Sequence, residues 1–312
     1  MDSCNFKRFV NETKNTMKLM EKALEWLLKM GGRGGMSDIP STRIKMDRAA
    51  KWLMPKVKQV TFTYETIQGV PVAWVKPVAA ASKVLLYLHS GAYVTGSIET
   101  HKNLAGTLVR QAGIQALVLD YRLAPEHPYP AAMEDVVAVY RYLLENGYTS
   151  EDIAIGGDSA GGGLSVAVLL YLRDHHLPLP NCAILLCPWL DLTNTSATYQ
   201  INKDIMLRKE DLDHAVRNYT AGKESITHPY VSPLYGRMKG LPPVLIHTGG
   251  RDVLQGEGMQ FVASAREEGV SVEHFNEPNG IHVWHAYYPF LNHAKTANAM
   301  IADYLRKQFQ NG

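Results

Sequence analysis

The spacing of apolar residues changes along the chain, and each change predicts a different kind of element. From 14 to 30, apolar residues recur at helical spacing, which predicts a helix that the glycine-rich stretch 31–35 ends. From 60 to 76, apolar and polar residues alternate on either side of Gln68-Gly69, a pattern typical of a β-hairpin. Further along, short continuous apolar runs alternate with longer helical segments.

The short apolar runs suit strands that are buried on both faces, and their alternation with helices indicates a mostly parallel sheet. The predicted strands cover 84–88, 116–119, 153–155, 183–186, 244–247 and 272–275. The predicted helices cover 100–112, 131–146, 160–175, 256–268 and 286–308. The pattern therefore predicts an α/β fold in which helices flank a central sheet.

The stretch 188–222 interrupts this alternation, because it holds no clear strand but has a helical pattern at 209–219. An insertion of this kind is a candidate lid over the carboxyl edge of the sheet, where ligands bind in such folds. The helix at 14–30 is expected to join it as a lid or core element. The alternative for that helix is an anchor on a membrane surface, but a wide apolar arc more often packs against protein.

Composition and charge argue against several classes of function. The chain has 312 residues, of which 46% are hydrophobic and 20% charged, and its formal net charge is +2. So small a charge gives no strong steering toward nucleic acid or an acidic membrane. No apolar stretch is long enough to span a bilayer, and Met1 to Asn5 does not open a signal sequence. We expect a cytoplasmic protein without a nucleic-acid partner or stable membrane insertion.

The cysteines indicate neither a disulfide framework nor a metal site. Cys4, Cys182 and Cys187 are three, so they cannot all pair within the chain. The last two lie in the apolar run 181–187 and are predicted to be buried free thiols. No cysteine or histidine cluster has zinc-site spacing, so no metal is expected.

The strongest local signal is Gly157-Asp158-Ser159-Ala160-Gly161, which matches G-x-S-x-G between a short apolar strand and a helix. This motif is the nucleophile elbow of α/β hydrolases, where a tight turn holds a serine at strained backbone angles and glycines avoid clashes. Ser159 is therefore the candidate nucleophile. The alternatives are an incidental glycine-rich helix start or a phosphate-binding site at a helix N-terminus. The nucleotide-binding motif G-x-x-x-x-G-K-[ST] is absent, which disfavours a nucleotide as the phosphate ligand.

A serine nucleophile needs a base, and the base needs an orienting acid, which follow the serine in the order acid, then histidine. Asp252 comes just after the predicted strand 244–247, where a triad acid belongs, although it also suits a helix cap. His282 follows the strand 272–275 and is the candidate base. His285, three residues later, is the alternative candidate for the base.

The negative charge of a tetrahedral intermediate needs hydrogen-bond donors. His89-Ser90-Gly91-Ala92 follows the predicted strand 84–88, at the place where this fold supplies an oxyanion loop. The backbone N–H groups of Gly91, Ala92 and Ala160 are the candidate donors. An ordinary turn with a buried histidine is the alternative.

Together these segments resemble the bacterial hormone-sensitive-lipase-like carboxylesterases of the α/β-hydrolase superfamily. The resemblance rests on the loop at 89–92, on 157–162 and on 120–132, which reads Asp-Tyr-Arg-Leu-Ala-Pro-Glu-His-Pro-Tyr-Pro-Ala-Ala. It runs from about residue 84 to the carboxyl terminus. It implies an α/β-hydrolase fold with a helical cap, and a triad of Ser159, Asp252 and His282 that hydrolyses esters through an acyl-enzyme without metal or cofactor.

The resemblance also implies a division of the chain. We expect an N-terminal cap segment at 1–45 and an α/β-hydrolase catalytic domain at 46–312, with a cap insertion at about 190–225. Glu126 resembles part of the family's supporting hydrogen-bond network. A homodimer is a further expectation from the family.

Two segments depart from the family pattern. The family's loop is usually His-Gly-Gly-Gly, whereas this chain has Ser90 and Ala92, and the histidine usually continues with Gly-Phe, whereas this chain has Val283-Trp284. Ala92 adds a methyl group near the acyl group, and Trp284 is expected to narrow the pocket. The residues expected to contact substrate are His89, Ser90, Tyr93, Asp158 and Trp284.

The predicted function is hydrolysis of small carboxylic esters, with a preference for short acyl chains. An amidase, lactonase or peptidase with the same triad is the alternative, because the acyl-enzyme chemistry is shared. A ligand-binding protein on the same fold is a third reading, and the retained histidine disfavours it.

Overall fold

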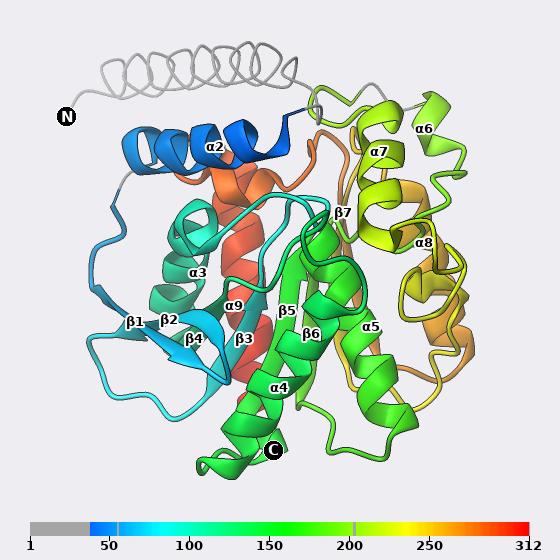
Figure 1. Cartoon of the computed structure of the whole chain (residues 1–312). Coiled ribbons are helices and arrows are strands. Elements are labelled where there is room, and N and C mark those ends of the chain that lie inside the picture. Colours follow the sequence, from blue (N-terminus) through cyan, green and yellow to red (C-terminus); the bar gives the residue numbers. More distant parts are fainter. Residues whose placement is uncertain (1–37, 55, 202–203, 312) are drawn as a thin grey trace, which may run out of the picture.

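The computed structural model describes residues 38–54, 56–201 and 204–311. The predicted helix at 14–30, the glycines after it and Cys4 lie outside the described residues. The described chain forms an eight-stranded sheet in the order β1-β2-β4-β3-β5-β6-β7-β8, with helices on both faces (Figure 1). The first pairings, β1 with β2 and β2 with β4, are antiparallel, and all the others are parallel. The predicted α/β-hydrolase fold class is confirmed.

The strands fall close to the predicted apolar runs. They are β1 (Val60–Ile67), β2 (Val70–Pro77), β3 (Val84–Leu88), β4 (Gln115–Leu119), β5 (Ile153–Asp158), β6 (Cys182–Leu186), β7 (Val244–Gly249) and β8 (Val272–Glu277). Every residue of β3 to β7 is buried, as expected for strands covered on both faces.

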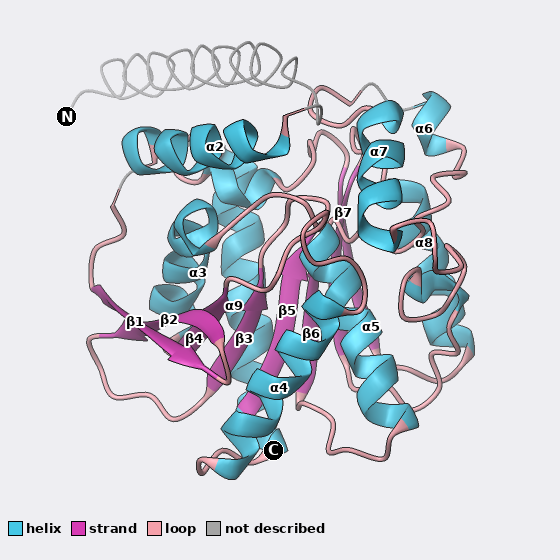
Figure 2. Ribbon diagram, in the orientation of Figure 1, coloured by secondary structure: helices cyan, strands magenta, loops and turns pink. Residues whose placement is uncertain are grey.

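The helices of the described chain are α2 (Ile39–Leu53), α3 (Ile98–Ala112), α4 (Ala131–Glu145), α5 (Ala160–Asp174), α6 (Thr198–Ile201), α7 (Lys209–Thr220), α8 (Gln255–Glu267) and α9 (Asn292–Asn311). Alternate strand residues face two separate cores. One core includes residues of α4, α5 and α8, and the other includes residues of α3 and α9 (Figure 2). Leu86 and Tyr87, which are adjacent in β3, belong one to each core.

The last helix begins later than predicted. The sequence predicts a helix from 286, but residues Trp284–Tyr287 form a short 3₁₀ turn and α9 begins at Asn292. Pro289 lies between the two, and proline lacks an N–H while disfavouring helical angles in the residue before it. This break keeps His285 in the turn rather than in the helix.

Three helices lie where the lid is predicted. Helices α6 and α7 fall within the predicted insertion at about 190–225, and α2 crosses the predicted boundary at residue 45. Figure 1 shows α2 and α7 on the side of the sheet where the parallel strands end. Among the described residues, no helix is long and apolar enough to cross a membrane.

Candidate active site

The turn between β5 and α5 holds Ser159 at φ 52° and ψ −121°, a conformation that non-glycine residues seldom adopt. A Cβ atom on Gly157 would lie 2.2 Å from the carbonyl oxygen of Leu88, and one on Gly161 would lie 2.0 Å from the same oxygen. Only glycine therefore allows this turn to pack against the end of β3. The N–H of Ser159 donates to the carbonyl of Leu186 at 2.9 Å, which ties the turn to β6.

The acid and base predicted from the sequence form a hydrogen-bonded pair. His282 Nδ1 lies 2.8 Å from Asp252 Oδ2, and both side chains are buried. A carboxylate only accepts, so Nδ1 carries the proton, which leaves Nε2 of the neutral ring with a lone pair. Burial opposes a charge on the ring, but the charge of Asp252 and its hydrogen bond outweigh burial and raise the pKa of His282.

Sheet topology brings these residues to one edge. Ser159 follows β5, Cys187 follows β6, Asp252 follows β7 and His282 follows β8, and parallel strands end on the same side of a sheet. The N–H of Cys187 donates to the carbonyl of His247 at 2.8 Å, which links the ends of β6 and β7. The fold thus gathers side chains that are far apart in sequence.

Within the described chain, one cluster has the donor types of a metal site. Side-chain donor atoms of Cys187, Asp252 and His282 all lie within 4.8 Å of one another. The contacting Asp252 and His282 atoms are only 2.8 Å apart, however, whereas two tetrahedral zinc ligands lie about 3.3 Å apart. Burial, with the nearby charge of Asp252, also raises the pKa of the Cys187 thiol well above its usual range. The spacing fits a hydrogen-bonded acid–base pair with a neutral thiol beside it.

The loop after β3 has three consecutive residues with positive φ. Gly91 has φ 120°, Ala92 has φ 53° and Tyr93 has φ 63°. A Cβ atom on Gly91 would lie 2.1 Å from the carbonyl oxygen of Thr95, so this position requires glycine. The N–H groups of Gly91, Ala92 and Ala160 donate no hydrogen bond to any other described residue. These are the donors that the sequence predicts for an oxyanion hole.

His89 is buried at the start of this loop. Its Nδ1 lies 2.7 Å from the carbonyl oxygen of Ser90, and its ring stacks on Tyr121 with the centroids 4.2 Å apart. Burial, more than the neighbouring charges, lowers the pKa of His89 to about 3, so the ring is neutral at pH 7. The contacts show His89 supporting the loop, and a direct contact with substrate stays a prediction.

Three other predicted substrate contacts have buried side chains with protein partners. Tyr93 stacks on Tyr219 of α7 with the centroids 3.9 Å apart, and Trp284 stacks on His285 at 4.0 Å. Asp158 is fully buried between hydrogen-bond donors from β3 and α3. That Trp284 narrows the acyl pocket therefore stays a prediction.

Sequence reasoning missed Arg43, which joins α2 to the rim of the site. Its guanidinium donates to the carbonyl oxygens of Val94 and Ala124, each at 2.8 Å, and makes two bonds to Glu126 at 3.0 and 2.8 Å. Glu126, which the family resemblance singles out, thus connects α2 to the segment after β4. No local pattern signals Arg43, because all its partners are distant in sequence.

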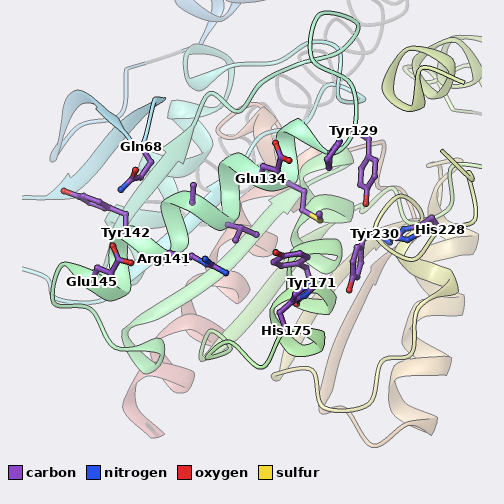
Figure 3. A pocket seen from close by; sticks show the side chains of 14 residues that line it. Gln68, Tyr129, Glu134, Arg141, Tyr142, Glu145, Tyr171, His175, His228 and Tyr230 are labelled. Carbon is purple, nitrogen blue, oxygen red and sulfur yellow. Dashed lines mark hydrogen bonds between the residues drawn. The ribbon is translucent and has the colours of Figure 1, made fainter. Parts of the chain in front are cut away.

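A separate groove of about 700 Å³ lies across α4 and the end of α5 (Figure 3). Its lining includes four tyrosines, two histidines and three charged side chains: Tyr129, Tyr142, Tyr171, Tyr230, His175, His228, Glu134, Arg141 and Glu145. Several of the rings contact each other, as where Tyr171 stacks on His175 at 3.9 Å. None of Ser159, Asp252 and His282 lines this groove.

A serine on a strained turn, a neighbouring loop with two N–H groups that have no acceptor among the described residues, and an acid–histidine pair at the carboxyl edge of this sheet are the features of an α/β hydrolase. Comparison with known proteins agrees. A family model described as the alpha/beta hydrolase fold matches residues 85–286.

The chain is 37% identical to an acetyl-hydrolase of Streptomyces hygroscopicus, over 90% of this chain and 94% of the relative. It is 34% identical to an esterase of Acinetobacter venetianus, over 81% of this chain and 84% of the relative. A crystal structure of an esterase from the bacterial hormone-sensitive lipase family is 36% identical and has a TM-score of 0.89, covering 93% of this chain and 98% of that one. The chain therefore belongs to the α/β-hydrolase family, in its hormone-sensitive-lipase-like branch, and is a carboxylic ester hydrolase.

Proposed function

We propose that this enzyme cleaves esters through an acyl-enzyme on Ser159, with His282 as general base and Asp252 as the acid that orients it. The observation that carries the proposal is the 2.8 Å bond between His282 Nδ1 and Asp252 Oδ2, at the sheet edge where Ser159 sits on its strained turn. This bond fixes the imidazole tautomer, so that Nε2 is the nitrogen free to accept the serine proton.

The proposed reaction has two halves. Ser159 Oγ attacks the ester carbonyl while its proton passes to His282 Nε2, and the N–H groups of Gly91, Ala92 and Ala160 stabilise the resulting oxyanion. The intermediate then collapses, the alcohol leaves with the proton from His282, and the acyl group stays on Ser159. Water next gives a proton to His282 and attacks the acyl-enzyme. The second tetrahedral intermediate then collapses, which releases the acid while His282 returns the proton to Ser159 Oγ.

The test of this mechanism is Ser159→Ala. The variant is expected to lose at least about 10⁴-fold in kcat toward a nitrophenyl ester, and to lose labelling by a fluorophosphonate probe. Ser165→Ala is the matched control, because Ser165 is a buried serine of α5 whose hydroxyl donates to the carbonyl of Gly161 at 2.7 Å. Hydrolysis by Ser159→Ala at the wild-type rate would show that the assignment is wrong.

We also propose a preference for short acyl chains. The methyl group of Ala92 stands in the loop that holds the oxyanion, and a relative of this chain is named an acetyl-hydrolase. Rates toward nitrophenyl esters of increasing acyl length are expected to fall beyond the short chains, and Ala92→Gly is expected to relax that limit. Rates that rise steadily into long chains would contradict the preference.

Three further expectations extend the proposal. A cap made of residues 1–45 and an insertion at about 190–225 is expected to cover the site, and limited proteolysis of these segments would test it. A homodimer is expected from the family, and light scattering would measure the mass in solution. A cytoplasmic location also stays a prediction, which fractionation of the source cells would check.

A further inference from the structure

A second buried acid–histidine pair lies directly beside the nucleophile turn. Asp158, the residue before Ser159, is fully buried; its Oδ1 accepts a hydrogen bond from the Tyr87 hydroxyl at 2.7 Å, and its Oδ2 lies 3.2 Å from His101 Nε2. The same Nε2 lies 2.9 Å from the hydroxyl oxygen of Ser90, which precedes Gly91 in the loop after β3. The proposed reaction mechanism uses none of these side chains.

His101 has hydrogen-bond partners at both of its ring nitrogens. Nδ1 lies 3.2 Å from the carbonyl oxygen of Ser97, which can only accept, and 2.7 Å from the hydroxyl of Thr100. Nε2 faces the carboxylate of Asp158, which in its charged form also only accepts. The N–H of Ser90 also lies 3.2 Å from Nε2, so Ser90 contacts this nitrogen through both its hydroxyl and its backbone. The hydroxyl makes the shorter of these two contacts, and it is the one that depends on the side chain of Ser90.

The pKa directions agree with this geometry. Burial opposes the charge on His101, but the charge of Asp158 and its hydrogen bond outweigh burial and raise the pKa of His101. Burial likewise opposes the charge on Asp158, yet the charge of His101 and the hydrogen bonds from His101, Tyr87 and Ser90 lower the pKa of Asp158. Both directions favour the form of the pair in which His101 is an imidazolium and Asp158 a carboxylate.

The cluster connects the two parts of the proposed oxyanion hole. Ser90 is adjacent to Gly91, while Asp158 is two residues before Ala160, and His101 bridges them from the first turn of α3. We propose that Ser90, His101 and Asp158 are positioning residues that hold the oxyanion loop against the nucleophile turn. The Ser90 hydroxyl supplies a link that a glycine at this position would lack.

The charge of the pair has a consequence for the reaction. A buried carboxylate beside the nucleophile turn would raise the energy of an oxyanion forming nearby, because like charges repel strongly in a low-dielectric interior. The imidazolium of His101 balances that charge while holding the loop in place. Removing His101 alone therefore affects the transition state more than the bound substrate.

The first experiment compares Ser90→Ala and His101→Gln with wild type, and it rests on the proposed acyl-enzyme mechanism. Loss of one hydrogen bond from Ser90 is expected to lower kcat about threefold to tenfold, and loss of His101 to lower it up to about 100-fold, with KM within about twofold in both cases. Ser165→Ala is the control for a buried hydroxyl, and His247→Gln the control for a buried histidine outside the cluster.

The second experiment is a double-mutant cycle with Asp158→Asn. If the pair acts as a unit, the His101→Gln, Asp158→Asn double variant retains more activity than the product of the single effects predicts, by at least about fivefold. Single effects that multiply, or a fall in melting temperature with unchanged kcat, overturn the proposal. Ser90→Ala decides the matter if the His101 variant does not fold, because that substitution removes only a hydroxyl.

Fluorophosphonate labelling separates failure of this inference from failure of the proposed function. If wild type is not labelled, or if Ser159→Ala is labelled equally well, the nucleophile assignment is wrong. If wild type is labelled at Ser159 but Ser90→Ala and His101→Gln keep the wild-type kcat, only the positioning cluster is wrong.

Discussion

Two regions of the interior contain buried histidines whose pKa values are shifted in opposite directions. Near the proposed oxyanion hole, His101 and His282 each face a carboxylate, and the pKa of each is raised. Behind the carboxyl edge, His247 of β7 faces His285, with Nδ1 of the first 3.0 Å from Nε2 of the second. Burial lowers the pKa of His247 to about 3 and lowers that of His285 well below its usual range.

All four rings are buried, so burial does not account for the difference. The direction of the pKa shift follows the partner, because a carboxylate offsets the loss of solvation and a second imidazole does not. The other two ring nitrogens of the neutral pair, Nε2 of His247 and Nδ1 of His285, have no hydrogen-bond partner among the described residues. The fold thus keeps protonatable rings beside the reaction and uncharged rings behind it.

The strongest test of this difference is Asp252→Asn. The substitution removes the charge and allows the wrong tautomer of His282, so kcat is expected to fall by about 10³- to 10⁴-fold. Asp204→Asn is the matched control, because the charge of Asp204 also raises the pKa of His282. The hydrogen bonds that the Asp204 carboxylate accepts come instead from the backbone N–H groups of Met206, Leu207 and Val253. Steady-state hydrolysis of a nitrophenyl ester measures both variants.

Equal losses in the two variants would contradict the argument. They would mean that negative charge near His282 matters and that the hydrogen bond from Asp252 does not. A folded Asp252→Asn protein with wild-type kcat would remove Asp252 from the mechanism altogether.

The sequence alone predicts the parts of the site that have local signatures. The positions of the strands along the chain follow from apolar runs, the turn at Ser159 from its flanking glycines, and the acid and base from their positions after predicted strands. Asp252 and His282 are 30 positions apart, yet each lies in a loop that the fold class already specifies.

The parts that depend on tertiary contacts are not predictable in this way. His101 and Asp158 are 57 positions apart, and Arg43 and Glu126 are 83 apart. A histidine in α3 or an arginine in α2 gives no local sign of its partner. Asp158 even belongs to the strongest motif in the sequence, but the motif does not specify what surrounds its side chain.

The neutral histidine pair is expected to make the protein sensitive to acid. Between about pH 6.5 and pH 3 the unfolded chain binds protons at His247 and His285 that the folded chain does not. The free energy of unfolding therefore falls as the pH decreases in this range, by at most about 1.4 kcal/mol per pH unit for each histidine that stays neutral.

Urea unfolding between pH 4.5 and 6.5 measures this slope, in buffers chosen around the unfolded pKa of about 6.5. His247→Gln is expected to lower the slope of the free energy of unfolding against pH by up to about 1.4 kcal/mol per pH unit, which is the contribution of one proton. His127→Gln is the control, because His127 is exposed. A slope that is unchanged in His247→Gln would show that this ring does not stay neutral in the folded protein.

The smallest expected effect is a shift in the pH dependence of kcat/KM. The proposed base works only when neutral, so activity rises with pH through the pKa of His282, which lies above its usual value of about 6.5. The charge of Asp204 favours the protonated ring, and removing it lowers the pKa of His282. In Asp204→Asn the acid limb is therefore expected to move to lower pH by a few tenths of a unit, up to about one unit.

The direction of that shift is the informative part, because loss of a merely structural contact changes the height of the profile without moving its midpoint. Glu210→Gln is the control, since it removes a carboxylate from the exposed face of α7. A midpoint that stays in place or moves to higher pH in Asp204→Asn would contradict the argument that the charge of Asp204 raises the pKa of His282.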